Sequence, residues 1–185
     1  MGSFLEIKKA IKIFKLHKSK ITILHCVSMY PAKKEILNLN KILLLKKKFK
    51  CDVGYSDHSI GPYACLTSIM LGANIIEKHF TLNKNMKGWD HSISADEEEL
   101  RFIVQGSKNI PIILGKKTFK VVETKKQIKN FRRSIVAKRS LNIGHTVTDK
   151  DLNYKRPGDG IPPNLYKKII GKKLKRNLKF DQQFK

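Results

Sequence analysis

Short apolar segments alternate with helix-like segments three times in the first 115 residues, and this alternation restricts the fold more than any other feature of the sequence. The apolar, strand-like runs are residues 21–26, 51–55 and 73–76, and the helix-like segments that follow them are 33–49, 62–71 and 94–107. A further helix is predicted at the start, where Ser3 and Glu6 have the spacing of a capping box. Strands that alternate with helices form parallel sheets, so the sequence predicts an α/β fold.

The charge balance raises the question of a nucleic-acid or membrane partner. Lys and Arg number 39 against 15 Asp and Glu, a net charge of +24, but only six of the basic residues are Arg. Specific phosphate and base contacts favour the bidentate guanidinium, so we expect a solvated lysine-rich surface and no nucleic-acid-binding function. No apolar run approaches the about 20 residues that span a bilayer, and no leader-like segment opens the sequence. Three cysteines without C-x-x-C spacing predict reduced thiols, and we expect a cytoplasmic protein without a membrane partner.

Each of the three apolar runs ends in a polar cluster. The clusters are residues 25–31, 54–59 and 77–81, and each contains a histidine. Because the carboxyl ends of parallel strands line one crevice, we expect the three clusters to form a shared site. Two imidazoles from neighbouring strands could hold a divalent metal with open positions, or each could form a local hydrogen bond instead. The spacing alone leaves both interpretations open.

The sequence changes character after residue 115. Residues 116–131 are lysine-rich and weakly periodic, and we predict a linker there. A short strand at 134–137, a turn capped by Thr148 and a cluster of Pro and Gly at 157–163 follow. About 50 residues are enough only for a small module. The predicted domains are therefore 1–115 and 132–185.

The strand-end motifs and the tail together resemble the sialic acid synthase family. The matching stretches are His25–Pro31, Gly54–His58, Ile75–Thr81, Gly88–Ser94, Arg132–Ala137 and Tyr154–Ile161. The resemblance implies that residues 1–115 are the C-terminal portion of a (β/α)8 TIM barrel and that 132–185 are a small β-rich antifreeze-like (SAF) domain. It also implies a reaction, in which phosphoenolpyruvate condenses with N-acetylmannosamine or a related N-acetylated amino sugar to give a sialic acid, or another nonulosonate, and phosphate.

The resemblance assigns catalytic and metal-binding roles to three residues. His58 and His79 match the family's ligands of a divalent metal ion, Mn²⁺ or Mg²⁺, and their alternative is a structural role. Glu77 lies two residues before His79, and residues i and i+2 of a strand share one face. Glu77 is therefore expected beside His79, where it would orient water; the alternative is a side chain on the opposite face.

Five further residues match substrate-binding positions of the family. Ser56 matches a hydroxyl that contacts phosphoenolpyruvate, and Ser28 occupies a position where some relatives use Asn for the same ligand. Tyr30 and Asp90 match a ring and a carboxylate that hold the sugar. Arg156 matches an SAF arginine that reaches the N-acetyl group in the partner subunit's site, which implies a homodimer with the SAF domain placed over the partner's barrel.

The sequence departs from the family in its number of strands. A (β/α)8 barrel needs eight strands and ~250 residues, and this sequence predicts about three barrel strands. The resemblance therefore implies either a separate chain that carries the N-terminal half-barrel, or a non-catalytic gene remnant in which only the SAF domain folds independently. On both interpretations the isolated chain is expected to be inactive, and neither the sugar nor the metal is specified further.

Overall fold

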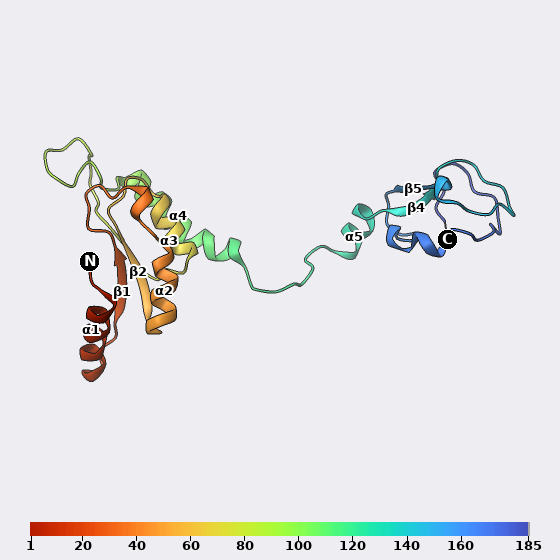
Figure 1. Ribbon diagram of the computed structural model, residues 1–185. Helices are drawn as coiled ribbons and strands as arrows, with labels where there is room; N and C mark the ends of the chain where they lie inside the picture. Colours follow the sequence, from red (N-terminus) through yellow and green to blue (C-terminus); the bar gives the residue numbers. More distant parts are fainter. Residues whose placement is uncertain (185) are drawn as a thin grey trace. The chain divides into compact units, whose positions relative to one another are not determined.

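The computed structural model describes residues 1–184 and divides into two compact units, Met1–Lys117 and a second unit that begins at Thr118 (Figure 1). The first unit contains α1 (Phe4–Leu16), β1 (Thr22–Cys26), the 3-10 helix η1 (Lys34–Ile36), α2 (Asn40–Phe49), β2 (Asp52–Asp57), α3 (Tyr63–Met70), β3 (Ile76–Lys78) and α4 (Glu97–Leu114). No helix within residues 1–184 is both long and apolar enough to cross a bilayer.

The three strands of the first unit form a parallel sheet in the order β1-β2-β3. The register pairs Thr22 with Asp52 at one end of β1, and Asp57 with Lys78 at the end of β3. Helices α2, α3 and α4 lie on one side of this sheet (Figure 1). The predicted strand–helix alternation with parallel strands is confirmed.

The core of the first unit forms where one face of β2 packs on the helices. Val53 and Tyr55 are fully buried against Ile42 of α2 and Ala64 of α3. Because side chains alternate across a strand, Asp57 shares this helix-facing side, and Ser56 lies on the other face. The sheet therefore has a packed face and a face on which polar groups are gathered.

One edge of β1 lies open. Within residues 1–184, β1 pairs only with β2. A groove of about 640 Å³ lies beside the strand, and its walls include Phe4 and Ile7 of α1, Ile23 of β1, and Leu44 of α2. Many large apolar side chains of the first unit are exposed, among them Phe4 and Leu44. This edge has the chemistry of a surface that another strand could cover.

The helix predicted over 33–49 is interrupted. Residues 34–36 form η1, and α2 begins only at Asn40, because Asn38 between them adopts a left-handed backbone with φ of 45°. The interruption affects which residues face inward: Leu37 is buried, whereas Ile36 in η1 is 42% exposed. Asparagine tolerates this backbone conformation better than most residues, so it suits the break.

Two other boundaries also differ from the prediction. Helix α4 begins after Asp96, whose carboxylate accepts a hydrogen bond from Glu99 N at 2.9 Å, and not at Ser94. The Ser94 hydroxyl instead donates to the carbonyl of Asp90 at 2.7 Å. Strand β3 lies two to three residues later than the predicted run at 73–76. Local propensity does not specify where a strand meets its neighbour.

The second unit is a small β structure with its own core. Its elements are α5 (Lys125–Phe131), β4 (Ser134–Ala137), the 3-10 helix η2 (Asp149–Asp151), β5 (Leu152–Lys155) and the 3-10 helix η3 (Pro163–Lys168). Strands β4 and β5 are antiparallel, and Ile135, Val147, Leu178 and Phe184 are among the buried core residues. Helix α5 lies within the predicted linker, and the carbonyl of Lys129 accepts a hydrogen bond from Gly158 N, which ties it to this unit.

A buried carboxylate holds one turn of the second unit together. Asp151 accepts hydrogen bonds from Arg139 Nε and Nη2 at 2.9 and 2.8 Å, from His145 Nε2 at 2.8 Å, and from Thr148 N and Oγ1 at 2.9 and 2.8 Å. Burial of Asp151 favours the neutral acid, but the hydrogen bonds from His145, Thr148 and Arg139 outweigh it and hold the pKa of this carboxyl well below its ordinary value.

The depressed pKa of Asp151 predicts acid sensitivity in the second unit. The carboxylate contributes stability that is fully present above the unfolded-state pKa of about 4 and is lost as the pH falls toward the folded-state pKa. Asp151→Asn is expected to lower the free energy of unfolding at pH 7 by about 2–3 kcal/mol and to flatten its decline below pH 4. Thermal unfolding between pH 7 and 2 measures both effects, with Asp149→Asn on the exposed side of the same turn as the control. Equal stability of the two variants would contradict this role.

Candidate functional site at the strand ends

The first unit places two histidines together at the carboxyl ends of neighbouring strands. His58 follows the last residue of β2, and His79 follows the last residue of β3. The register pairs Asp57 with Lys78, so the two histidines occupy the next position along both strands. Their ring centroids lie 5.3 Å apart with an angle of 64° between the ring planes. This geometry agrees with the expectation that the two imidazoles meet at the carboxyl ends of the strands.

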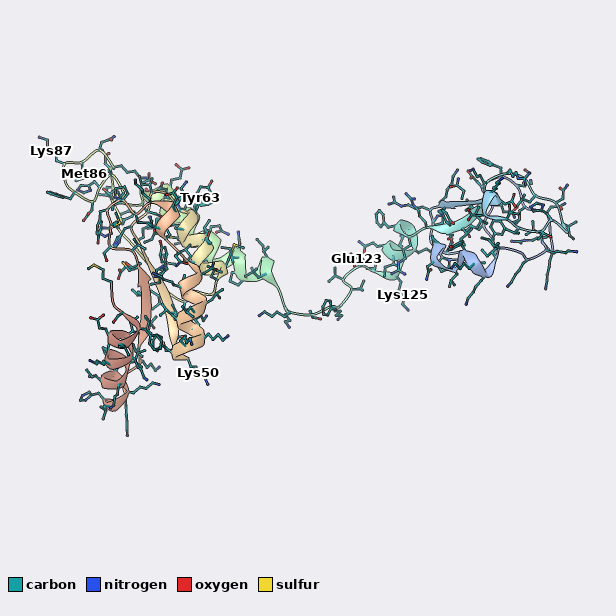
Figure 2. All side chains as sticks on the ribbon, in the orientation of Figure 1. Lys50, Tyr63, Met86, Lys87, Glu123 and Lys125 are labelled. Atoms are coloured by element: carbon teal, nitrogen blue, oxygen red, sulfur yellow. The ribbon has the colours of Figure 1, made fainter. Side chains whose placement is uncertain are left out.

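Figure 2 helps to locate the carboxyl ends of the strands. Tyr63, at the start of α3, lies toward one end of the first unit, and Lys50, which directly follows α2, lies at the other. The labelled Met86 and Lys87 lie on a loop beyond the Tyr63 end. This loop follows β3 and leads to α4. The site therefore lies at the strand ends from which the β3–α4 loop departs.

Tyr30 lies against both imidazoles. Its ring centroid is 4.1 Å from that of His58 and 5.8 Å from that of His79. The side chain comes from the segment that follows β1, so three successive strand ends contribute to the cluster. Tyr30 remains 54% exposed, which leaves much of its surface accessible to a ligand.

The β3–α4 loop adds a carboxylate to the cluster. Asp90 Oδ2 lies 3.5 Å from His79 Nδ1, and both side chains are partly exposed. The loop is anchored at its base: Thr81 N donates to the carbonyl of Ala95 at 2.9 Å, and the Thr81 hydroxyl lies 2.8 Å from His91 Nδ1. His91 therefore has a structural partner within the loop.

Ser56 and Glu77 form a cross-strand pair two residues before the histidines. They are aligned in the β2–β3 register, and the Ser56 hydroxyl donates to Glu77 Oε1 at 2.7 Å. Ser56 is buried, whereas Glu77 is exposed. Residues two apart on a strand share a face, so this pair lies on the same side of the sheet as His58 and His79.

The other two predicted site residues have contacts of their own within their respective units. Ser28 is exposed, and its hydroxyl lies 3.8 Å from Cys26 Sγ. Arg156 belongs to the second unit, where its Nε donates to the carbonyl of Phe131 at 3.0 Å and its guanidinium lies 5.3 Å from the Phe131 ring centroid. His25, from the first polar cluster, contacts the carbonyl of Leu37 at 2.7 Å and is a buried structural histidine.

Neighbouring oxygen atoms favour one tautomer of each imidazole. His58 Nδ1 lies 3.0 Å from the carbonyl of Val27, and because a carbonyl only accepts, Nδ1 carries the proton. The carboxylate of Asp90 beside His79 Nδ1 favours the same tautomer. In both rings Nε2 then keeps its lone pair, which is the arrangement found in histidines that bind metal.

His58 and His79 could supply two of the ligands of a divalent metal ion. No group of three or more His, Cys, Asp or Glu with metal-binding geometry occurs among residues 1–184. Two histidines would therefore leave most coordination positions for water and substrate oxygens. An ion held in this way can act as a Lewis acid, because its open positions admit a carbonyl.

An ion pair that sequence reasoning did not assign to any role lies directly beside the site. Lys78 Nζ donates to Asp57 Oδ2 at 2.7 Å, and the side chains are 4% and 0% exposed. Burial of Asp57 favours the neutral acid, but hydrogen bonds from Lys78 and Ser59 outweigh it and hold the pKa of this carboxyl below its ordinary value. Burial also raises the pKa of the neighbouring Tyr55 and Cys65. The sequence does contain a signal for this pair, because a charged residue directly precedes both His58 and His79. Adjacent residues of a strand lie on opposite faces of the sheet.

The fold and the site define a parallel α/β protein with a polar, two-histidine strand-end site, followed by a small β module. Residues 1–119 match the NeuB family, and residues 132–184 match the SAF domain. The chain belongs to the NeuB family, and the resemblance to sialic acid synthases is confirmed at this level.

Individual relatives agree with this assignment. An uncharacterized protein of Methanocaldococcus jannaschii is 40% identical over 98% of this chain and 54% of its own length. The N,N'-diacetyllegionaminic acid synthase of Campylobacter jejuni is 38% identical over 98% of this chain and 56% of its own length. The crystal structure of the N-acetylneuraminic acid (sialic acid) synthetase of Leptospira borgpetersenii, in complex with citrate, has a TM-score of 0.63 and 40% identity over 68% of this chain and 44% of that one. The chain thus spans about half the length of the curated relatives it matches.

Proposed function

We propose that this chain supplies part of the active site of a phosphoenolpyruvate-dependent nonulosonate synthase. The single observation that carries the proposal is the His58–His79 pair at the strand ends, with ring centroids 5.3 Å apart and both Nε2 atoms available. In the proposed reaction, carbon 3 of phosphoenolpyruvate forms a bond with the aldehyde carbon of an N-acetylated amino sugar. Water adds to carbon 2, and the C–O bond to phosphate breaks.

His58 and His79 would hold Mn²⁺ or Mg²⁺, since imidazole together with oxygen ligands suits several divalent ions. The bound ion would polarise the sugar aldehyde. Glu77, oriented by the Ser56 hydroxyl, would position the water, and Ser56 itself would contact phosphoenolpyruvate together with Ser28. These roles place the catalytic groups on the face of the sheet opposite the helices.

The sugar would lie between Tyr30 and Asp90. Tyr30 offers an exposed ring beside the imidazoles, and Asp90 offers a carboxylate that can accept hydrogen bonds from two hydroxyls. Arg156 would reach the N-acetyl group of a sugar bound in the partner subunit of a homodimer. In the isolated chain the guanidinium of this exposed side chain contacts Phe131.

The first unit would be the C-terminal portion of a (β/α)8 barrel, completed by a polypeptide that carries the remaining strands. The open edge of β1 and the apolar groove beside it support this proposal, because every strand of a closed barrel is paired on both sides. The 116–131 segment would link the barrel to the SAF domain. We also propose that the protein is cytoplasmic and that the isolated chain is inactive.

Reconstitution tests this function. The full chain is mixed with the part of the Campylobacter jejuni legionaminic acid synthase that it does not match, together with phosphoenolpyruvate, Mn²⁺ and either N-acetylmannosamine or a di-N-acetylated sugar. Release of inorganic phosphate that requires both polypeptides and a sugar is expected, and the preferred sugar identifies the substrate. A soluble pair that releases no phosphate would favour the alternative, a non-catalytic synthase fragment, because the chain spans about half of its relatives.

A further inference from the structure

Successive cross-strand pairs join β2 to β3 where the two strands approach the site. In order along the strands, the pairs are Ser56 with Glu77, Asp57 with Lys78 and, one residue beyond, His58 with His79. The first and third pairs lie on the site face of the sheet, and the middle pair faces the helices. The middle pair is therefore adjacent in the chain to both proposed metal ligands.

The middle pair is the most completely bonded polar group of the first unit. Asp57 Oδ1 accepts from Tyr55 Oη at 3.0 Å and from Ser59 N and Oγ at 2.9 and 2.7 Å. Asp57 Oδ2 accepts from Lys78 Nζ at 2.7 Å and from Cys65 Sγ at 3.3 Å. Lys78 Nζ also donates to the carbonyl of Ser59 at 2.7 Å. The hydrogen bonds of this one ion pair thus connect β2, β3, α3 and the turn after β2.

A buried ion pair adds little net stability, and in some proteins it contributes conformational specificity instead. The desolvation of two charges offsets most of their attraction, and an apolar pair of similar shape is often as stable. A misaligned strand, however, would leave Lys78 or Asp57 buried without its partner, which is strongly unfavourable. The pair therefore penalises any register of β3 other than the one that brings His79 to His58.

We propose that Asp57 and Lys78 are positioning residues that set the separation of the His58 and His79 rings for metal binding. The inference rests on the proposed function, since it takes the two imidazoles as metal ligands. Neither residue contacts the metal or a substrate in this assignment. Each acts through the histidine that follows it, from the opposite face of the sheet.

The test is Mn²⁺ binding by the full chain with the double substitution Asp57→Asn/Lys78→Met. This variant removes both charges and keeps the side chains close to their original size, so its thermal unfolding is expected within a few degrees of wild type. The Mn²⁺ dissociation constant, from the electron paramagnetic resonance signal of the free ion, is expected to rise about 10–100-fold, as when supporting groups of metal ligands are removed. Arg139→Met, which breaks an ion pair in the second unit, is the matched control and should leave the dissociation constant unchanged.

A second measurement needs no metal. A nuclear Overhauser effect between the His58 and His79 rings is expected in wild type, from rings 5.3 Å apart, and is expected to weaken or vanish in the double variant. An unchanged ring contact, or an unchanged dissociation constant in a folded variant, would overturn the proposal. If the double variant and Asp57→Asn alone both fail to unfold cooperatively, the pair maintains the fold instead, and the proposal is again overturned.

These outcomes are distinct from failure of the proposed function. If the wild-type chain and variants substituted at His58 and His79 bind Mn²⁺ equally well, the metal assignment is contradicted. The ring contact would still decide whether Asp57 and Lys78 position the two imidazoles.

Discussion

His58→Ala/His79→Ala is expected to weaken Mn²⁺ binding by the full chain more than about 100-fold. The loss should exceed that from removing supporting groups, which costs about 10–100-fold, because both proposed ligands are removed. The same variant is expected to release no phosphate when it is reconstituted with the complementary polypeptide. Isothermal titration calorimetry measures the binding, and a phosphate assay measures the turnover.

The control for this experiment is a histidine outside the site. His17 follows α1 and is exposed, so His17→Ala should bind Mn²⁺ as wild type does. Circular dichroism verifies that the double variant keeps its helices and strands. A folded double variant that binds Mn²⁺ with wild-type affinity would show that the ion, if bound, uses other ligands, and the proposed function would lose its main support.

Gly54→Val is expected to unfold the first unit, with a loss of about 3 kcal/mol or more in its free energy of unfolding. A Cβ atom on Gly54 would lie 2.5 Å from Leu24 Cδ2 and 2.6 Å from the carbonyl oxygen of Ile75. The leucine side chain can move, but the carbonyl cannot, because it accepts a hydrogen bond from Tyr55 N at 2.9 Å. The close approach of β2 and the start of β3 therefore requires glycine at this position.

Two features of the chain make the Gly54 prediction measurable. The second unit has its own core, so its thermal transition should be retained in the variant and serves as an internal reference. Gly2→Val is the matched substitution, because a Cβ atom there meets only Ile7 Cγ1 at an ordinary 3.6 Å. An unfolding transition of the first unit within 1–2 °C of wild type would show that the sheet accommodates the added side chain.

Local signals in the sequence were sufficient for several elements of the fold. The Ser3–Glu6 capping box forms as predicted, with Glu6 N bonded to Ser3 Oγ and Ser3 N bonded to the Glu6 carboxylate. The apolar run at 21–26 corresponds to β1. These features depend on residues within a few positions of one another, and so a single sequence specifies them.

Features that depend on tertiary contacts could not be predicted in the same way. The break at Asn38 accompanies burial of Leu37, and the periodicity of 33–49 does not reveal either feature. Asp57 and Lys78 are 21 residues apart in sequence, and the bond between them depends on the register of β2 and β3. For the site, the strand-end rule anticipated that His58 and His79 meet, but not that His25 turns to the helix side and bonds to Leu37. Side chains alternate along β1, so a shift of one residue in its register would move the His25 side chain to the other face of the sheet.

The open edge of β1 also affects how the protein behaves at high concentration. Within residues 1–184 no second strand covers this edge, and exposed apolar side chains flank it. Such an edge is a template for intermolecular pairing, so overproduction of the chain by itself should favour aggregation and inclusion bodies. Co-expression with a polypeptide that carries the complementary strands should increase the soluble yield.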